Sequence, residues 1–555
     1  MEKYRTLFVL GVVLGLSLVS AGQSQSLSSS SSDPFKLTAG SSFSASGSAD
    51  TRRNASASIA STRSSVFEAE EIIRKNYGGG RTPSYETMTG SAISGALASL
   101  DPHSRFYGRA AWRELLDEEQ SGYVGIGVSI STFEVGDTRE TYVISTFAGS
   151  PAAKAGLRYG DRLVSTDGAR IAGLTASEVR EVLRGVENSS LILTVERAAT
   201  LHTERFSLRR SRIEQPTVRD SYIIEDSVGY IDLSEGFSFT TYTEFDSALR
   251  KLKRLGATSL VLDLRGNPGG IVEQAVKVAE RFLPAGTLIL SQQGRTRQDD
   301  REWRSANRTP ETMPVVLLVD RDTASASEIV AGALQDNDRA LVVGEKTFGK
   351  GLVQSVISTP GQTGITLTAA RYLTPSGRSI QRDYTSISRY EYFGGRTPAD
   401  AIDRPYVEVK TNAGRRMVGG DGIHPDIESQ SAIFSDIERR LSAPVFLFVR
   451  ELLNARIDGA TPSVNRPVGR RLTRADLDIR AAVDAFGRFV EGRIAVPNAS
   501  RKQLEEAIVR EVARGSFPSP TADQLAVDLD PQIKKALGSV ADAKRLLALA
   551  SADAR

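Results

Sequence analysis

Short apolar runs alternate with amphipathic segments through the middle of the chain. The runs that predict buried strands are at residues 230–233, 260–264, 315–318 and 340–343. Segments whose apolar residues recur every three or four positions predict helices at residues 244–255 and 272–283. Apolar strands that alternate with helices are typical of a sheet covered by helices. The pattern therefore predicts an α/β core.

A helical segment is predicted before this core, over residues 64–120. Val66, Ile72 and Ile73 fall in one helical pattern, and residues 93–100 form a second one. The second pattern ends at Asp101-Pro102-His103-Ser104, where His103 is expected to be a structural turn residue.

The region after the core, residues 431–555, is predicted to be mainly helical. The clearest patterns are at residues 437–453 and 504–513. Amphipathic helices more often contribute to a protein core than to a docking surface for a partner. We therefore expect a packing or assembly role for this region, with adaptor or partner binding left open. Residues 385–420 are charged and contain glycine, which suggests that this segment forms an excursion of the chain that lies outside the core.

The N-terminus has the pattern of an export signal. Lys3 and Arg5 precede an apolar run from Leu7 to Val19, and small residues end it at Ala21. We expect a signal peptide at 1–21, with an uncleaved membrane anchor as the alternative. Residues 22–63 are rich in serine, alanine and glycine, which predicts a disordered tether. The expected location is periplasmic or extracellular.

Composition narrows the possible chemistry. The chain has 555 residues, of which 40% are hydrophobic and 25% charged, as in soluble proteins with several domains. The net charge of +3, without a basic patch interleaved with aromatics, predicts no nucleic-acid partner. Because there is no cysteine, a thiol nucleophile and a disulfide are excluded. We expect neither a metal nor a cofactor.

A candidate nucleophile precedes a glycine-flanked lysine. Residues 323–330 read TASASEIV, and residues 349–351 read GKG. A serine hydroxyl needs an adjacent base, and a lysine can serve if its surroundings favour the neutral amine. The only histidines, His103, His202 and His424, lie in no recognisable motif with Ser325. The pattern favours a Ser325–Lys350 dyad, although Ser325 or Ser327 could instead cap a helix.

These motifs together resemble the C-terminal processing peptidases, also called tail-specific proteases. The resemblance covers roughly residues 64–430, and we find no close counterpart for the C-terminal region. Its motifs are LDLRGNPGG at 262–270, SASE at 325–328, GEKTFGKGLVQ at 344–354, TAARYLTPSGRSIQ at 368–381 and GIHPD at 422–426. It implies Ser325 as nucleophile, Lys350 as base and Gln354 in the same constellation. It also implies a core at 199–430 that is similar to the crotonase and Clp-protease spiral.

Physical reasoning assigns the supporting roles. A glycine-rich loop after a buried strand can present backbone amides, and the first amide of a helix favours developing negative charge. We predict that Gly270 and Ala326 form the oxyanion hole, with Gly269 as an open alternative. Lys350 needs a lowered pKa, which the apolar Phe348, Leu352 and Val353 could provide by desolvation. On an extended strand, Gln354 would share a face with Lys350 and could orient its amine.

A second module precedes the core, at residues 121–198. The sequences YVGIGVSI at 123–130 and SPAAKAGLRYGDRL at 150–163 resemble a PDZ domain. A helix at 175–184 would form the other wall of its groove. The peptide-carboxylate ligands implied are the backbone amides of Gly125, Ile126, Gly127 and Val128.

The leading hypothesis is an exported serine endopeptidase that acts through an acyl-enzyme. Its expected substrates are proteins or peptides with accessible, apolar C-termini. One alternative is a catalytically silent scaffold that binds C-termini, which the presence of Ser325, Lys350 and Gln354 disfavours. The other is a crotonase-type acyl-CoA enzyme, for which no CoA-specific feature is apparent. Oligomer partners are not predicted from the sequence.

Overall fold

The structure is a computed structural model. It describes residues 64–79, 82–385, 387–394, 407–411, 413–431, 436–467, 470–491 and 499–553. The predicted signal peptide and tether lie outside the described residues. Within the described ranges, none of the helices has the length and apolar character needed to span a bilayer.

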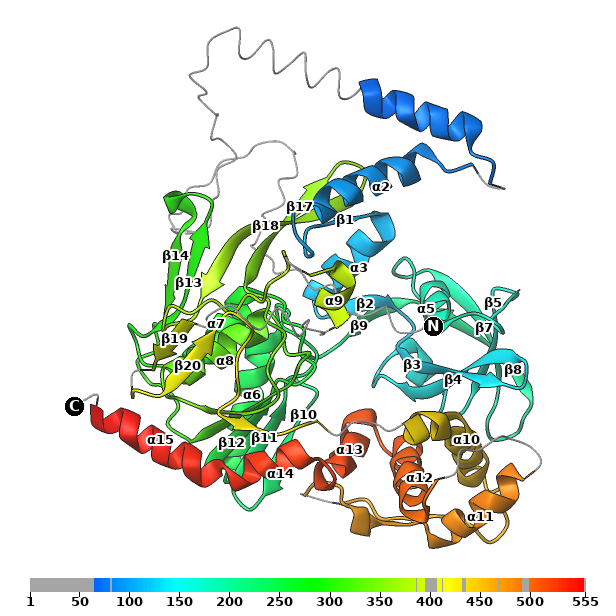
Figure 1. Ribbon diagram of the computed structural model, residues 1–555. Helices are drawn as coiled ribbons and strands as arrows, with labels where there is room; N and C mark the ends of the chain where they lie inside the picture. The colour runs from blue at the N-terminus through cyan, green and yellow to red at the C-terminus, as the bar shows by residue number, and fades with distance from the viewer. Residues whose placement is uncertain are drawn as a thin grey trace, which may run out of the picture.

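A six-stranded sheet forms the centre of the α/β core (Figure 1). Its strands, in spatial order, are β10 (Asp220–Glu225), β11 (Val228–Asp232), β12 (Ser259–Asp263), β15 (Val315–Val319), β16 (Leu341–Gly344) and β21 (Ile427–Glu428). Neighbouring strands from β11 to β21 pair in parallel, whereas β10 pairs antiparallel with β11. The apolar runs of the sequence thus form the buried strands that were predicted.

Helices cover both faces of this sheet. On one face lie α6 (Thr241–Arg254), α7 (Val272–Glu280) and α8 (Ala326–Asp336), which pack with Leu260 and Leu262. On the other face lie α14 (Pro531–Gly538) and α15 (Val540–Asp553), which pack with Val261 (Figure 1). Because successive strand residues point to opposite faces, a strand apolar throughout must be covered twice. The end of the C-terminal region therefore completes the α/β core.

A second sheet joins the N-terminal segment to the core. Its strands are β1 (Arg105–Tyr107), β18 (Thr363–Leu373), β13 (Leu288–Gly294) and β14 (Arg301–Arg304), with β17 (Leu352–Thr359) paired to β18. Residues 64–76 are helical, and α2 (Tyr85–Ala98) and α3 (Arg109–Glu119) flank β1 in the chain. Since Arg105 pairs with Thr366, the turn at residues 101–104 lies beside β18.

The PDZ-like module has its own sheet and core. Its sheet contains β3 (Val128–Val135), β4 (Thr138–Thr146), β5 (Arg162–Thr166), β7 (Ser190–Glu196) and β8 (Thr203–Arg209), with β6 (Ala169–Arg170) on β5. Its helices are α4 (Pro151–Lys154) and α5 (Ala176–Leu183). Both ends of the module meet where β2 (Gly122–Gly125) pairs with β9 (Ser211–Glu214) (Figure 1). The module is therefore inserted, and its last strand lies beyond residue 198.

A helical domain packs against the PDZ-like module. Its main helices are α10 (Asp436–Leu453), α11 (Arg480–Val490) and α12 (Arg501–Ser516), followed by α13 (Ser519–Asp523). They share a hydrophobic core that is separate from the one around the six-stranded sheet. The ring of Phe446 stacks on Phe133 at 4.5 Å, and Tyr159 donates a hydrogen bond to Glu511 at 2.7 Å. These contacts fix the module from the side opposite α5 (Figure 1).

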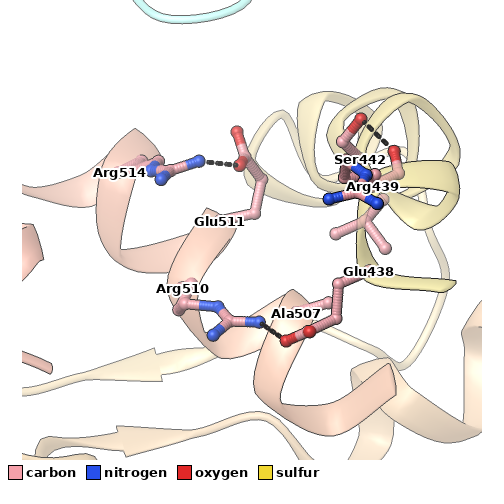
Figure 2. A pocket seen from close by; sticks show the side chains of 8 residues that line it. Glu438, Arg439, Ser442, Ala507, Arg510, Glu511 and Arg514 are labelled. Atoms are coloured by element: carbon pink, nitrogen blue, oxygen red, sulfur yellow. Dashed lines mark hydrogen bonds and ion pairs between the residues drawn. The ribbon is translucent and has the colours of Figure 1, made fainter. Parts of the chain in front are cut away.

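A cavity of about 260 Å³ lies between α10 and α12 (Figure 2). Its charged walls are paired: Arg510 contacts Glu438 at 2.8 Å, and Arg514 contacts Glu511 at 3.4 Å. None of the predicted site residues lines it. Ion pairs of this kind are typical of the interface between two packed helices.

The remaining elements are short. They are α9 (Arg389–Gly394), β19 (Val407–Lys410), β20 (Arg416–Gly419), β22 (Ser463–Val464), β23 (Leu477–Asp478) and the 3-10 helices η1 (Arg297–Asp299), η3 (Arg474–Asp476) and η4 (Gln524–Asp528). Of these, α9, β19 and β20 lie in the predicted excursion at 385–420, where β19 and β20 form an antiparallel pair.

Candidate active site

Ser325 lies in a strained turn between strand β15 and helix α8. It immediately precedes the helix with φ 58° and ψ −117°, a conformation that non-glycine residues rarely adopt. The side chain is 0% exposed, and its Oγ has no hydrogen-bond partner among the described residues. A capping serine would bond to the first turn of the helix, which this hydroxyl does not do. Strain of this kind occurs at functional sites.

Glu328 connects Ser325 to the lysine segment. Its Oε2 accepts hydrogen bonds from the N–H of Ser325 at 2.8 Å and from the N–H of Lys350 at 2.9 Å. Its Oε1 accepts from Thr347 Oγ1 at 2.6 Å and from the N–H of Gly349 at 2.8 Å. A single carboxylate therefore brings the backbones of the two candidate dyad residues together.

This role of Glu328 was not predicted from the sequence. The available signal was its position directly before the apolar residues 329–331 of the helix, because an acid that is fully buried must be paired. Burial raises the pKa of Glu328, while its four hydrogen bonds act in the opposite direction.

Lys350 is buried, with 6% of its surface exposed. Burial is the main cause that lowers its pKa to about 8, and the neighbouring Arg105 adds to the effect. The negative charges of Glu328 and Asp101 act in the opposite direction and raise the pKa of Lys350. The carbonyl of Lys350 accepts a hydrogen bond from the hydroxyl of Tyr372 at 2.5 Å. A substantial fraction of the amine is therefore neutral just above neutral pH.

The loop after β12 packs directly on Ser325. A side chain at Gly269 would meet Ser325 Cβ at 2.7 Å, so only glycine fits there. The N–H of Gly269 donates to Asn267 Oδ1 at 2.9 Å, whereas the N–H groups of Gly270 and Ala326 donate to no acceptor among the described residues. The hydrogen bonding thus favours Gly270 over Gly269 as an oxyanion donor.

Gln354 lies on β17, four residues after Lys350, and is 0% exposed. Its Nε2 donates to Thr368 Oγ1 at 2.6 Å, and its Oε1 has no partner among the described residues. The strand begins at Leu352, so Lys350 lies just before it.

The histidines are not bonded to Ser325. The ring nitrogen Nε2 of His103 forms a hydrogen bond with the hydroxyl of Tyr392 at 2.8 Å. The backbone N–H of His103 donates to Asp101 Oδ1. Burial lowers the pKa of His103 well below its usual value, and Lys350 is the next cause. His103 is thus a neutral turn residue near the lysine. Among the described residues, no cluster of three or more His, Asp or Glu side chains could hold a metal.

The predicted carboxylate loop lies beside an arginine that sequence reasoning missed. Gly127 has φ 73°, and a side chain there would meet Ser150 Cβ at 2.3 Å. At the end of α5, the Arg184 guanidinium lies 4.9 Å from the ring centre of Tyr123 and contacts Glu114 at 2.6 Å. Burial raises the pKa of Tyr123, while Arg184 and the Val128 N–H lower it. The sequence signal that could have identified Arg184 was a basic residue directly after α5, the helix that forms one wall of the groove.

Comparison with known proteins identifies the family. The model of peptidase family S41 matches residues 227–387, and a PDZ-domain model matches residues 147–197. The carboxyl-terminal-processing protease of Synechocystis sp. is 38% identical over 302 residues, which cover 54% of this chain and 69% of that protein. This chain belongs to the carboxyl-terminal-processing protease family.

A second relative gives a similar match. The carboxy-terminal-processing protease of Bartonella bacilliformis is 34% identical over 305 residues, covering 54% of this chain and 68% of that protein. A solved photosystem II D1 C-terminal processing protease is 28% identical, with 66% of this chain and 86% of that chain covered and a TM-score of 0.35.

Family membership confirms several predictions. The chain is a serine-type protease with a PDZ domain, and proteins or peptides are its substrates. The α/β fold with an inserted PDZ domain and a helical C-terminal region is also confirmed. Membership in a protease family favours the endopeptidase over the silent scaffold and the acyl-CoA enzyme.

Proposed function

We propose that this family member cleaves peptide bonds through an acyl-enzyme on Ser325, with Lys350 as the general base. The observation that carries the proposal is the buried Glu328 oxygen that accepts the N–H groups of both residues. The lowered pKa of Lys350, about 8, and the uncommitted Ser325 hydroxyl support it. The test is cleavage of an unfolded protein with an apolar C-terminus, with Ser325→Ala protein alongside.

The reaction would begin when neutral Lys350 takes the proton of Ser325 Oγ, which attacks the scissile carbonyl carbon. The N–H groups of Gly270 and Ala326 would stabilise the oxyanion. Lys350 then gives its proton to the leaving amine, and an ester remains on Ser325. Lys350 next takes a proton from water, which attacks the ester and releases the new C-terminus. Ser325 regains its proton from Lys350.

Turnover should rise with pH, with a midpoint near 8. The reactive amine is the neutral form, and the pKa of Lys350 is lowered to about 8, so activity is lost as pH falls below that value. Single-turnover cleavage across a pH series measures the midpoint, and circular dichroism checks the fold at each pH. A midpoint near 6.5 that vanishes when one histidine is replaced would assign the base to histidine instead.

The PDZ domain would select substrates by their C-terminal carboxylate. The amides of Gly125, Ile126, Gly127 and Val128 would bind the carboxylate, with Arg184 as a cation at the same end of the groove. An apolar last side chain would enter the groove between β3 and α5. This activity from protein C-termini is what the relatives' names describe.

Amidation of the substrate's C-terminus should lower kcat/KM by about 10-fold or more, because the site loses the charge it recognises. A charged final residue should have a similar effect. Arg184→Ala should weaken cleavage of the free acid and leave the amide unchanged, with Arg205→Ala, on a strand outside the groove, as control. Equal cleavage of both substrates below saturation would contradict carboxylate recognition.

We also propose that the protein is exported. The support is the N-terminal sequence, with its basic start, apolar run and small-residue end. Its compartment would be periplasmic or extracellular, or it would remain attached through an uncleaved N-terminus. N-terminal sequencing of the protein recovered from cell fractions distinguishes these outcomes, and an intact N-terminus in the cytosolic fraction would overturn export.

A further inference from the structure

A chain of hydrogen bonds leads from the turn at residues 101–104 to Gln354. Ser104 Oγ donates to Asp101 Oδ2 at 2.6 Å and accepts the N–H of Thr368 at 3.1 Å. Thr368 Oγ1 then accepts Nε2 of Gln354 at 2.6 Å. The sheet sets this arrangement, because Thr368 is directly opposite Gln354 in the β17–β18 pair.

The two ends of the Gln354 amide have different surroundings in this arrangement. Thr368 uses the nitrogen, so the oxygen is left, buried and without a partner among the described residues. A buried carbonyl oxygen without a hydrogen bond is costly, so its retention calls for an explanation. The turn that anchors the chain also lies close to Lys350, since Asp101 and Arg105 both influence that amine.

We propose that Thr368 is a positioning residue for the Ser325–Lys350 reaction, which holds the Gln354 amide with its oxygen toward the Lys350 amine. The inference rests on the proposed dyad and adds a residue to it. Thr368 acts only through Gln354 and exchanges no proton with the substrate.

The chemistry explains why the orientation matters. A neutral amine has two N–H bonds and one lone pair, and the lone pair must face Ser325 Oγ to accept its proton. An amide oxygen that accepts an N–H of the amine leaves the lone pair free for the serine. A reversed amide would offer N–H donors instead, which would occupy the lone pair and disfavour the ammonium form.

The test compares Thr368→Val, which removes the hydroxyl at nearly constant volume, with Thr368→Ser, which keeps it. The valine variant should lose about 10-fold in single-turnover rate, as for one hydrogen bond of ordinary strength, with KM nearly unchanged. The midpoint of its pH profile should move to lower pH. The serine variant should restore both. Thr363→Val, on the same strand beside Thr359, is the control and should behave as wild type.

A double-mutant cycle separates positioning from general structural effects. Thr368→Val should add nothing to the loss caused by Gln354→Ala, because both remove the same oriented amide. Additive losses, or a Thr368→Val protein with the wild-type rate and pH midpoint, would overturn the inference. If the valine variant does not fold, Thr368→Ala gives the same comparison, since Thr368 is only half-buried.

The outcomes also distinguish this inference from the proposed dyad. An active, folded Lys350→Ala protein would refute the dyad itself. An inactive Lys350→Ala protein together with a fully active Thr368→Val protein would refute only the role of Thr368.

Discussion

Alanine at Ser325 should abolish peptide cleavage, and alanine at Lys350 should reduce it by about 100- to 10,000-fold, the range of a lost general base. The first change removes the attacking oxygen and the second removes the proton acceptor. Both proteins should remain folded, because neither side chain accounts for the Glu328 contacts, which use backbone N–H groups. Cleavage of an unfolded substrate, followed by mass spectrometry, gives the rates, and thermal unfolding checks the fold.

The controls make this result specific. Lys350→Arg should also fail, because a guanidinium stays protonated. Lys346→Ala should retain activity, since that lysine instead pairs with Asp421. Substitutions of His103, His202 and His424 should spare the chemistry. Full proteolysis by folded Lys350→Ala protein would refute the assignment of the base.

Glu328→Ala should cause the second-largest loss, in both stability and activity. The change leaves four buried donors without an acceptor, at about 1–3 kcal/mol for each that stays unpaired. We expect the free energy of unfolding to fall by at least about 3 kcal/mol. Turnover per folded molecule should fall by about 100-fold, because Ser325 and Lys350 lose their shared anchor.

Asp336→Asn is the matched control for this prediction. Asp336 is a buried acid at the opposite end of α8, where it pairs with Arg378 at 2.6 Å. Its replacement should destabilise the protein without the same loss of turnover per folded molecule. If Glu328→Ala retained both wild-type stability and wild-type turnover, the carboxylate could not be what joins the dyad.

Much of the core could be predicted because its signals are local. Apolar strand runs, helical spacing and glycine-flanked motifs located β12, β15 and β16 to within a residue or two. The choice between Gly269 and Gly270 could not be made, because it depends on where the Asn267 side chain points. The hydrogen bonds of Glu328 to the N–H groups of Ser325 and Lys350 could not be predicted either, because these residues lie in segments that are distant in the chain.

The outer parts were harder for related reasons. Residues 203–209 are mostly polar and exposed, with Phe206 and Leu208 as their two apolar side chains, which conceals β8 as part of the PDZ sheet. The sequence of α14 and α15 was interpreted as part of a separate packing or assembly region. However, β12 and β15 are apolar on both faces, so helices had to cover the second face of the sheet as well. Arg184 was overlooked because its position beside Tyr123 follows from the fold of the groove.

Labelling with a fluorophosphonate tests the Ser325–Lys350 dyad most directly, because this probe reacts with activated serines and remains attached. Peptide mapping should place the label on Ser325, at a rate that drops sharply in Lys350→Ala and is unchanged in His103→Ala. Label on another residue, or equal labelling of Ser325 with and without Lys350, would contradict the account.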